Sequence, residues 1–203
     1  MTSTTLPTPQ DNENRTARLI TDGMEPRNVI VLVSLGVGAA QDNPATGLLW
    51  ALEAILFAAA MPMAYIKYGM RTGMWADRHV GQRQRRLLLI PVIMASVGAG
   101  IGGMLWLDAP RPMLALVVAM LATLAVLLPV TAFWKISVHT AVAGGALAML
   151  ALTYGPLVWI AAPLIAVIAW SRISLRDHTL AQTIAGAAAG TVTAGLVFAA
   201  LNG

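Results

Sequence analysis

The sequence predicts an all-α protein, a polytopic transmembrane helix bundle with six to seven membrane segments, on three observations. Hydrophobic residues make up 58% of the 203 residues and charged residues only 11%, which is too apolar for a soluble domain of this size. The apolar residues form long runs, several of them near the roughly 20 residues that a helix needs to cross a bilayer. Short turns with Pro, Gly or charged residues separate these runs.

The first 27 residues differ from the rest of the chain. They contain Pro7, Pro9 and an Asp-Asn-Glu-Asn run among charges of both signs. They lack the basic start, apolar stretch and cleavage site of a signal peptide. We therefore expect residues 1–27 to be a polar, flexible or interfacial N-terminal tail and residues 28–203 to be a transmembrane domain.

Apolar segments then follow one another to the end of the chain. The first, residues 28–40, is shorter than a full span, so we expect it to be tilted, extended or re-entrant. The last contains Gly186, Gly190 and Gly195, a small-residue face that suits close helix packing. The segments after the first are predicted at residues 46–66, 87–107, 113–133, 140–153, 157–170 and 183–201.

Polar residues gather between these segments, mostly on one side of the membrane. Two consecutive pairs of segments each cross and return, so three polar clusters should meet on one side: residues 67–86, 134–139 and 171–182. If residues 28–40 also cross, every Lys and Arg except Arg111 lies on that side. An excess of cations marks the cytoplasmic side of a membrane protein. The sequence thus predicts a multi-pass protein of the cell membrane with these clusters at the cytoplasmic face.

The chemistry of the three clusters favours an anionic ligand. Each cluster holds one histidine, but the surrounding cations oppose a divalent metal ion, and the chain has no cysteine for a thiolate site. Arginine and lysine side chains match phosphate oxygens, and the amides of the helix that follows Ser137 also favour anions. The histidines His139 and His178 begin two spans, where they could supply a nucleophile and a general acid.

The same cations allow two other interpretations. The net charge of +4 does not indicate nucleic-acid binding, because the basic residues lie in short loops between apolar segments. Alternatively, the loop arginines only set the membrane topology and contact lipid headgroups. We expect no metal and no cofactor, with membrane lipid and a lipid phosphate as the partners.

Three short segments resemble motifs of the type 2 phosphatidic acid phosphatase (PAP2) superfamily. Ser171–His178 has Ser-Arg, five residues and His, which matches the third motif. Lys135–His139 resembles the second motif, Pro-Ser-Gly-His, with Val138 in place of Gly. Arg78–Arg86, an arginine and two more arginines after six residues, resembles the first motif, Lys-x6-Arg-Pro. The resemblance covers roughly residues 45–201 as a topology.

This resemblance implies an integral membrane lipid-phosphate phosphatase, a phosphoric monoester hydrolase that needs no cofactor. His178 would attack phosphorus and form a phosphohistidine, and His139 would protonate the leaving alkoxide. Substrates of this kind include a polyprenyl-phosphate derivative or a phosphatidate-like lipid. The implied phosphate-binding residues are Arg172, Lys135, Ser137, Arg78, Arg85 and Arg86.

The sequence departs from the family pattern four residues after the implied nucleophile, where Gln182 replaces an Asp. An amide still orients an imidazole by accepting from its ring N–H. It does not stabilise the imidazolium as a carboxylate does, so we expect a slower enzyme. The alternative is a protein with a degenerate PAP2 site, either a carrier or flippase-like protein that binds anionic lipid without catalysis, or a structural membrane protein.

Overall fold

The computed structural model describes residues 9–74 and 83–203, and the side chains of residues 15–74 and 89–203. Within these ranges every element is a helix and no strand occurs. The helices are α1 (Pro9–Gly23), α2 (Pro26–Ala39), α3 (Pro44–Ile55), α4 (Met61–Arg71), α5 (Arg83–Trp106), α6 (Arg111–Phe133), α7 (Val138–Tyr154), α8 (Pro163–Ser174) and α9 (Leu180–Asn202). A π-helical turn, Leu56–Ala60, joins α3 to α4, and a 3-10 helix, Pro156–Ala161, precedes α8.

The helices of the described chain include five that are long and apolar enough to cross a membrane. They are Pro44–Arg71, Leu89–Trp106, Arg111–Phe133, Pro156–Ser174 and Leu180–Asn202. The two shorter apolar helices are α2 and α7. The predicted all-α membrane bundle is confirmed, and its helices fall at the segments that the apolar runs indicate.

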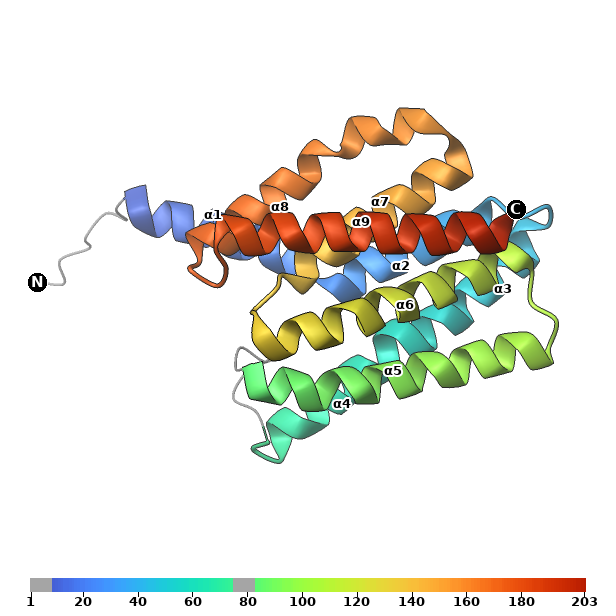
Figure 1. Cartoon of the computed structure of the whole chain (residues 1–203), viewed down its shortest axis with the longest axis horizontal. Coiled ribbons are helices and arrows are strands. Elements are labelled where there is room, and N and C mark those ends of the chain that lie inside the picture. Colours follow the sequence, from blue (N-terminus) through green and yellow to red (C-terminus); the bar gives the residue numbers. More distant parts are fainter. Residues whose placement is uncertain (1–8, 75–82) are drawn as a thin grey trace, which may run out of the picture.

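Helices α7 and α9 form a close pair, with α2 packed on α7 and α6 packed on α9 (Figure 1). Most residues of α7 are buried, and most of the buried ones are Gly, Ala or Thr. Glycines allow the two backbones to approach: a methyl group on Gly190 would collide with the carbonyl oxygen of Ala141, and one on Gly186 with that of Ser137. The small-residue face predicted for the last segment therefore packs against α7, at the end where the polar clusters lie.

Most of the polar connections gather at one end of the bundle. Figure 1 shows the α6–α7 connection, the α8–α9 loop, α1 and the end of α4 at the left. The turns after α2, α5 and α7 lie at the opposite end with the C-terminus. Two of the three predicted clusters, residues 134–139 and 171–182, thus meet at one end. The third lies partly outside the described residues.

Helix α1 packs on α8, within the segment for which the sequence predicted a flexible or interfacial tail. Ala17 is fully buried, and the hydroxyl groups of Thr21 and Ser171 lie 3.0 Å apart in a buried hydrogen bond. The Asn28 side-chain amide donates to the carbonyls of Asp22 and Gly23, at 3.2 and 3.0 Å, and so fixes the turn into α2. The polar N-terminal segment thereby becomes part of the polar end of the bundle.

The π-helical turn in the α3–α4 span lies just before Pro62. In a π-helix the Phe57 carbonyl would accept from the backbone N–H of residue 62, and proline has none. The Ser96 hydroxyl on α5 donates to that carbonyl instead, at 2.7 Å. The turn buries Ala58 and Ala59, which line the cavity described below.

Candidate active site

His178 lies in the α8–α9 loop, which begins with a well-defined C-terminal cap of α8. The Asp177 N–H donates to the Arg172 carbonyl at 3.0 Å, and the Arg176 N–H donates to the Ile173 carbonyl at 2.8 Å. These two bonds form a Schellman motif, in which the residue after the helix adopts a left-handed conformation. Arg176 holds that position with φ 57°, where glycine is usual. The His178 N–H also donates to the Arg172 carbonyl, at 3.2 Å, which ties the histidine to the end of α8.

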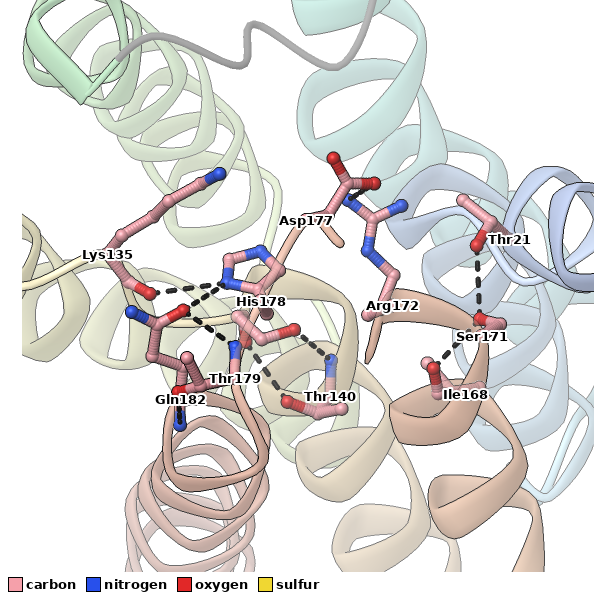
Figure 2. A network of polar contacts seen from close by, with 11 residues as sticks. Thr21, Lys135, Thr140, Ile168, Ser171, Arg172, Asp177, His178, Thr179 and Gln182 are labelled. Carbon is pink, nitrogen blue, oxygen red and sulfur yellow. Dashed lines mark hydrogen bonds and ion pairs between the residues drawn. The ribbon is translucent and has the colours of Figure 1, made fainter. Parts of the chain in front are cut away.

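Two acceptors define the tautomer of the His178 imidazole. Its Nδ1 lies 3.2 Å from the Lys135 carbonyl oxygen and 3.2 Å from Gln182 Oε1, as Figure 2 shows. Neither oxygen can donate a hydrogen, so Nδ1 carries the proton of the neutral ring. The lone pair of the neutral imidazole therefore resides on Nε2. That is the protonation state that a nucleophilic histidine requires.

Gln182 has a second role at the start of α9. Its Oε1 accepts the Thr179 backbone N–H at 3.1 Å, and the Thr179 hydroxyl accepts the Gln182 N–H at 3.4 Å. This reciprocal pair is a capping box. The bond from a backbone N–H also identifies the side-chain atom as the oxygen. Gln182 thus lies where the sequence prediction put it, beside His178 Nδ1, and it also caps the helix.

His139 enters the site from the first turn of α7. Ser137 caps this helix, because its hydroxyl accepts the Thr140 N–H at 3.5 Å. The Thr140 hydroxyl donates to the Thr183 carbonyl at 2.8 Å and joins the starts of α7 and α9. Ser137 is fully buried in this capping role, and its predicted contact with phosphate stays a prediction.

Arg172 and Lys135, both predicted phosphate ligands, have different surroundings. Arg172 is 2% exposed, and its Nη2 pairs with Asp177 Oδ2 at 3.0 Å. Lys135 contributes its backbone carbonyl to His178, and its ammonium extends away from the Gln182 amide in Figure 2. Both residues therefore adjoin the His178 loop, while their binding of phosphate remains a prediction.

A cavity of about 180 Å³ brings the two histidines together. His139 and His178 line it along with Glu25 and Arg27, and this polar set adjoins a much larger apolar lining. The apolar lining comes from Pro26, Ile30, Ala58, Ala59, Pro62, Met63, Ile66, Leu89, Ile93, Leu124, Val138 and Val142. A neighbouring cavity of about 60 Å³ shares Ile30, Ala58, Leu124 and Val142 with it, so the apolar space extends deeper between the helices.

The remaining predicted residues are only partly covered by the structure. Arg78 lies outside the described residues. Arg85 and Arg86 belong to the first turn of α5, and their side chains are likewise outside the described set. Within the described ranges, no group of His, Asp and Glu side chains is arranged to hold a metal ion.

Sequence reasoning missed Glu25 and Arg27, which line the cavity beside the histidines. Both were assigned to the tail because they precede the first apolar run. The signal that could have identified them is Glu-Pro-Arg directly before that run, since proline favours the first turn of a helix. The sequence indicates where α2 begins, but it does not show that this first turn meets α7 and the His178 loop.

Comparison with protein families matches residues 106–203 to the model of the PAP2 superfamily. These residues run from the end of α5 through α9 and contain both Lys135–His139 and Ser171–His178. The first of the three predicted motifs, Arg78–Arg86, lies before them. No curated protein and no solved structure matches the chain.

Proposed function

Because the chain belongs to the PAP2 superfamily through residues 106–203, we propose that it is an integral membrane phosphatase that acts on a lipid phosphate. One observation carries the proposal. His178, with its Nδ1 proton held by two acceptors, lines the same cavity as His139. A nucleophile and a proton donor beside one apolar cavity are what phosphate-ester hydrolysis on a lipid requires.

The proposed reaction has two steps. Nε2 of His178 attacks phosphorus, the P–O bond to the lipid breaks, and protonated His139 gives its proton to the leaving alkoxide. Water then attacks the phosphohistidine, the P–N bond breaks, and His139 takes the proton from water. The products are the lipid alcohol and inorganic phosphate. A nearby positive charge stabilises the phosphoryl oxygens in both steps.

The shape and lining of the cavity support a lipid substrate. Apolar side chains from α2, the α3–α4 span, α5, α6 and α7 surround the polar end that holds the histidines. A volume of about 180 Å³ accommodates a phosphate and the adjoining part of a chain, not a complete lipid. We propose that the tail continues through the neighbouring cavity and between helices into the bilayer. A polyprenyl-phosphate derivative or a phosphatidate-like lipid has this form.

Phosphate release by the purified protein tests the proposal. The substrates would be farnesyl phosphate, a longer polyprenyl phosphate and phosphatidate in detergent micelles. We expect wild-type protein to release phosphate and His178→Ala to lose about 1,000-fold or more of the rate, because removing a nucleophile abolishes the covalent route. Arg111→Ala, at the opposite end of the bundle, is the control and should match wild type.

Two results would contradict the proposal. One is equal phosphate release by wild type and His178→Ala. The other is binding of lipid phosphate by the wild type without release from any substrate, which would instead support the carrier interpretation. Acid-labile labelling from a [³²P]phospholipid, present in wild type and absent from His178→Ala, would identify the phosphohistidine.

A further inference from the structure

We infer that the α1–α2 junction, Met24–Arg27, completes the substrate site and that Arg27 binds the phosphoryl oxygens of the lipid phosphate. This inference rests on the proposed function and adds a substrate-binding residue to it. The junction lies outside residues 106–203, which match the family. The chain would therefore draw part of its phosphate site from a segment that precedes the family domain.

The position of Arg27 in the cavity is the first observation. Among the cations whose side chains the structure describes, Arg27 is the one that lines the cavity with His139 and His178. Arg172 is nearly fully buried and is not among the residues that line this cavity. A phosphate dianion placed beside two histidines in a mostly apolar cavity needs a compensating charge within reach. Arg27 is placed to supply it.

The second observation is the way Glu25 holds the guanidinium. Glu25 Oε2 lies 2.7 Å from Arg27 Nε, and the Glu25 side chain is 5% exposed while that of Arg27 is 35% exposed. This pair engages the Nε edge of the guanidinium. The Nη amino groups form the other edge, and a phosphate typically takes two parallel N–H bonds from such an edge. Glu25 thus serves as a positioning residue for Arg27.

The third observation is that the junction is firmly attached to the bundle. The Glu25 carbonyl accepts the Asn28 N–H at 2.9 Å and so begins α2, with Pro26 in its first turn. The Thr21 hydroxyl bonds to Ser171, the residue before Arg172. The first turn of α2 lines the cavity and carries no acidic residue beyond the cap position.

Binding measured without turnover tests the inference. In the His178→Ala background, farnesyl phosphate and farnesol would be titrated against protein in detergent. Adding Arg27→Ala should weaken binding of farnesyl phosphate about 10- to 100-fold, the range for a lost charged hydrogen-bonding pair, and leave farnesol binding unchanged. Arg27→Lys should keep part of the affinity, because lysine retains the charge without the fork. Arg111→Ala is the matched control cation.

The outcomes are separable. Equal affinity of the parent and Arg27→Ala for farnesyl phosphate, or no binding by either, would overturn the inference. An equal loss for farnesyl phosphate and farnesol would also overturn it, because it would show a structural effect. If wild type with His178 intact releases no phosphate while Arg27→Ala still selectively weakens binding, the inference stands and the proposed phosphatase function fails. If wild type hydrolyses lipid phosphate and Arg27→Ala does so with unchanged KM, only the inference fails.

Discussion

At the residue scale, one amide oxygen connects the helix start to the proposed nucleophile. Gln182 Oε1 accepts from both Thr179 N–H and His178 Nδ1, which uses the two acceptor positions of an amide oxygen. Such an oxygen orients the ring, but it carries only a partial charge. When His178 becomes positively charged during phosphoryl transfer, the amide stabilises it less than a carboxylate would.

Gln182→Glu is therefore expected to increase the rate of phosphate release, by about 10-fold or more. Glutamate has the same length as glutamine, is the usual partner in a capping box, and adds a negative charge at a helix N-terminus, where such a charge is stabilising. Phosphate release with farnesyl phosphate at saturation measures the effect. Gln182→Met, of similar length without an acceptor, is the control and should be slower than wild type. A Gln182→Glu enzyme slower than wild type would contradict this role.

The sequence predicted part of this residue-scale geometry. Motif spacing predicted His139, His178 and Gln182 as site residues, because each motif is a local pattern in the chain. The tautomer of His178 was not predictable, since it depends on the Lys135 carbonyl 43 residues away. Arg27 was missed for a related reason, because only the folded chain brings the α1–α2 junction to the histidines.

At the element scale, the close contact of α7 and α9 sets the positions of the site residues. Ser137 N–H donates to the Gln182 carbonyl at 3.3 Å, and Thr140 bonds to the Thr183 carbonyl. Gly186 permits this contact, because a methyl group there would meet the Ser137 carbonyl oxygen and lie 2.5 Å from Thr140 Oγ1. The glycine is therefore required for the distance between α7, which carries His139, and α9, which begins just after the His178 loop.

Gly186→Ala should destabilise the bundle by about 1–3 kcal/mol, since the added methyl overpacks a contact made with backbone. We also expect phosphate release to fall, because α9 would move relative to α7. Thermal unfolding in detergent and the phosphate assay measure the two effects. Gly98→Ala is the matched control: a methyl group there meets nothing within 4 Å, so it should be neutral or stabilising by up to about 1 kcal/mol. Equal behaviour of the two variants would contradict the packing argument.

The helices themselves were largely predictable from the sequence. Runs of apolar residues and the prolines, glycines and charges between them placed α2 to α9 within a few residues, because both signals are local. Two element-scale features were not foreseen. The π-helical turn at Leu56–Ala60 depends on Ser96 from another helix, and the docking of α1 depends on a surface of α8 that exists only after folding.

At the scale of the whole molecule, both halves of the chain contribute residues to the proposed site. The half that matches the family model, residues 106–203, contributes His139, His178 and the residues that hold them. The preceding half contributes much of the cavity wall, through Ile30 on α2 and Ala58 in the α3–α4 span. The proposed phosphate site thus lies between the two halves, at the polar end of the bundle (Figure 1).

The distribution of cations predicts that this polar end faces the cytoplasm. The chain has no cysteine, so single cysteines can report the orientation. Thr72→Cys, at the polar end, should react with a membrane-impermeant maleimide only after cells are permeabilised. Asp42→Cys, at the opposite end, should react in intact cells. Labelling in the reverse pattern would place the polar end outside, where the substrate would have to be reached from the outer leaflet.

The Schellman motif at the end of α8 explains the spacing between Arg172 and His178 in the sequence. Five residues separate Arg172 from His178 because the chain turns back on itself there, with Asp177 and His178 both bonded to the Arg172 carbonyl. The geometry of the helix end therefore sets the number of residues between Arg172 and His178. The residues between them can change, as Arg176 in a usual glycine position shows. The number of these residues cannot change, because one residue more or fewer would displace the His178 imidazole. Its Nδ1–H would then lose the Lys135 carbonyl as an acceptor.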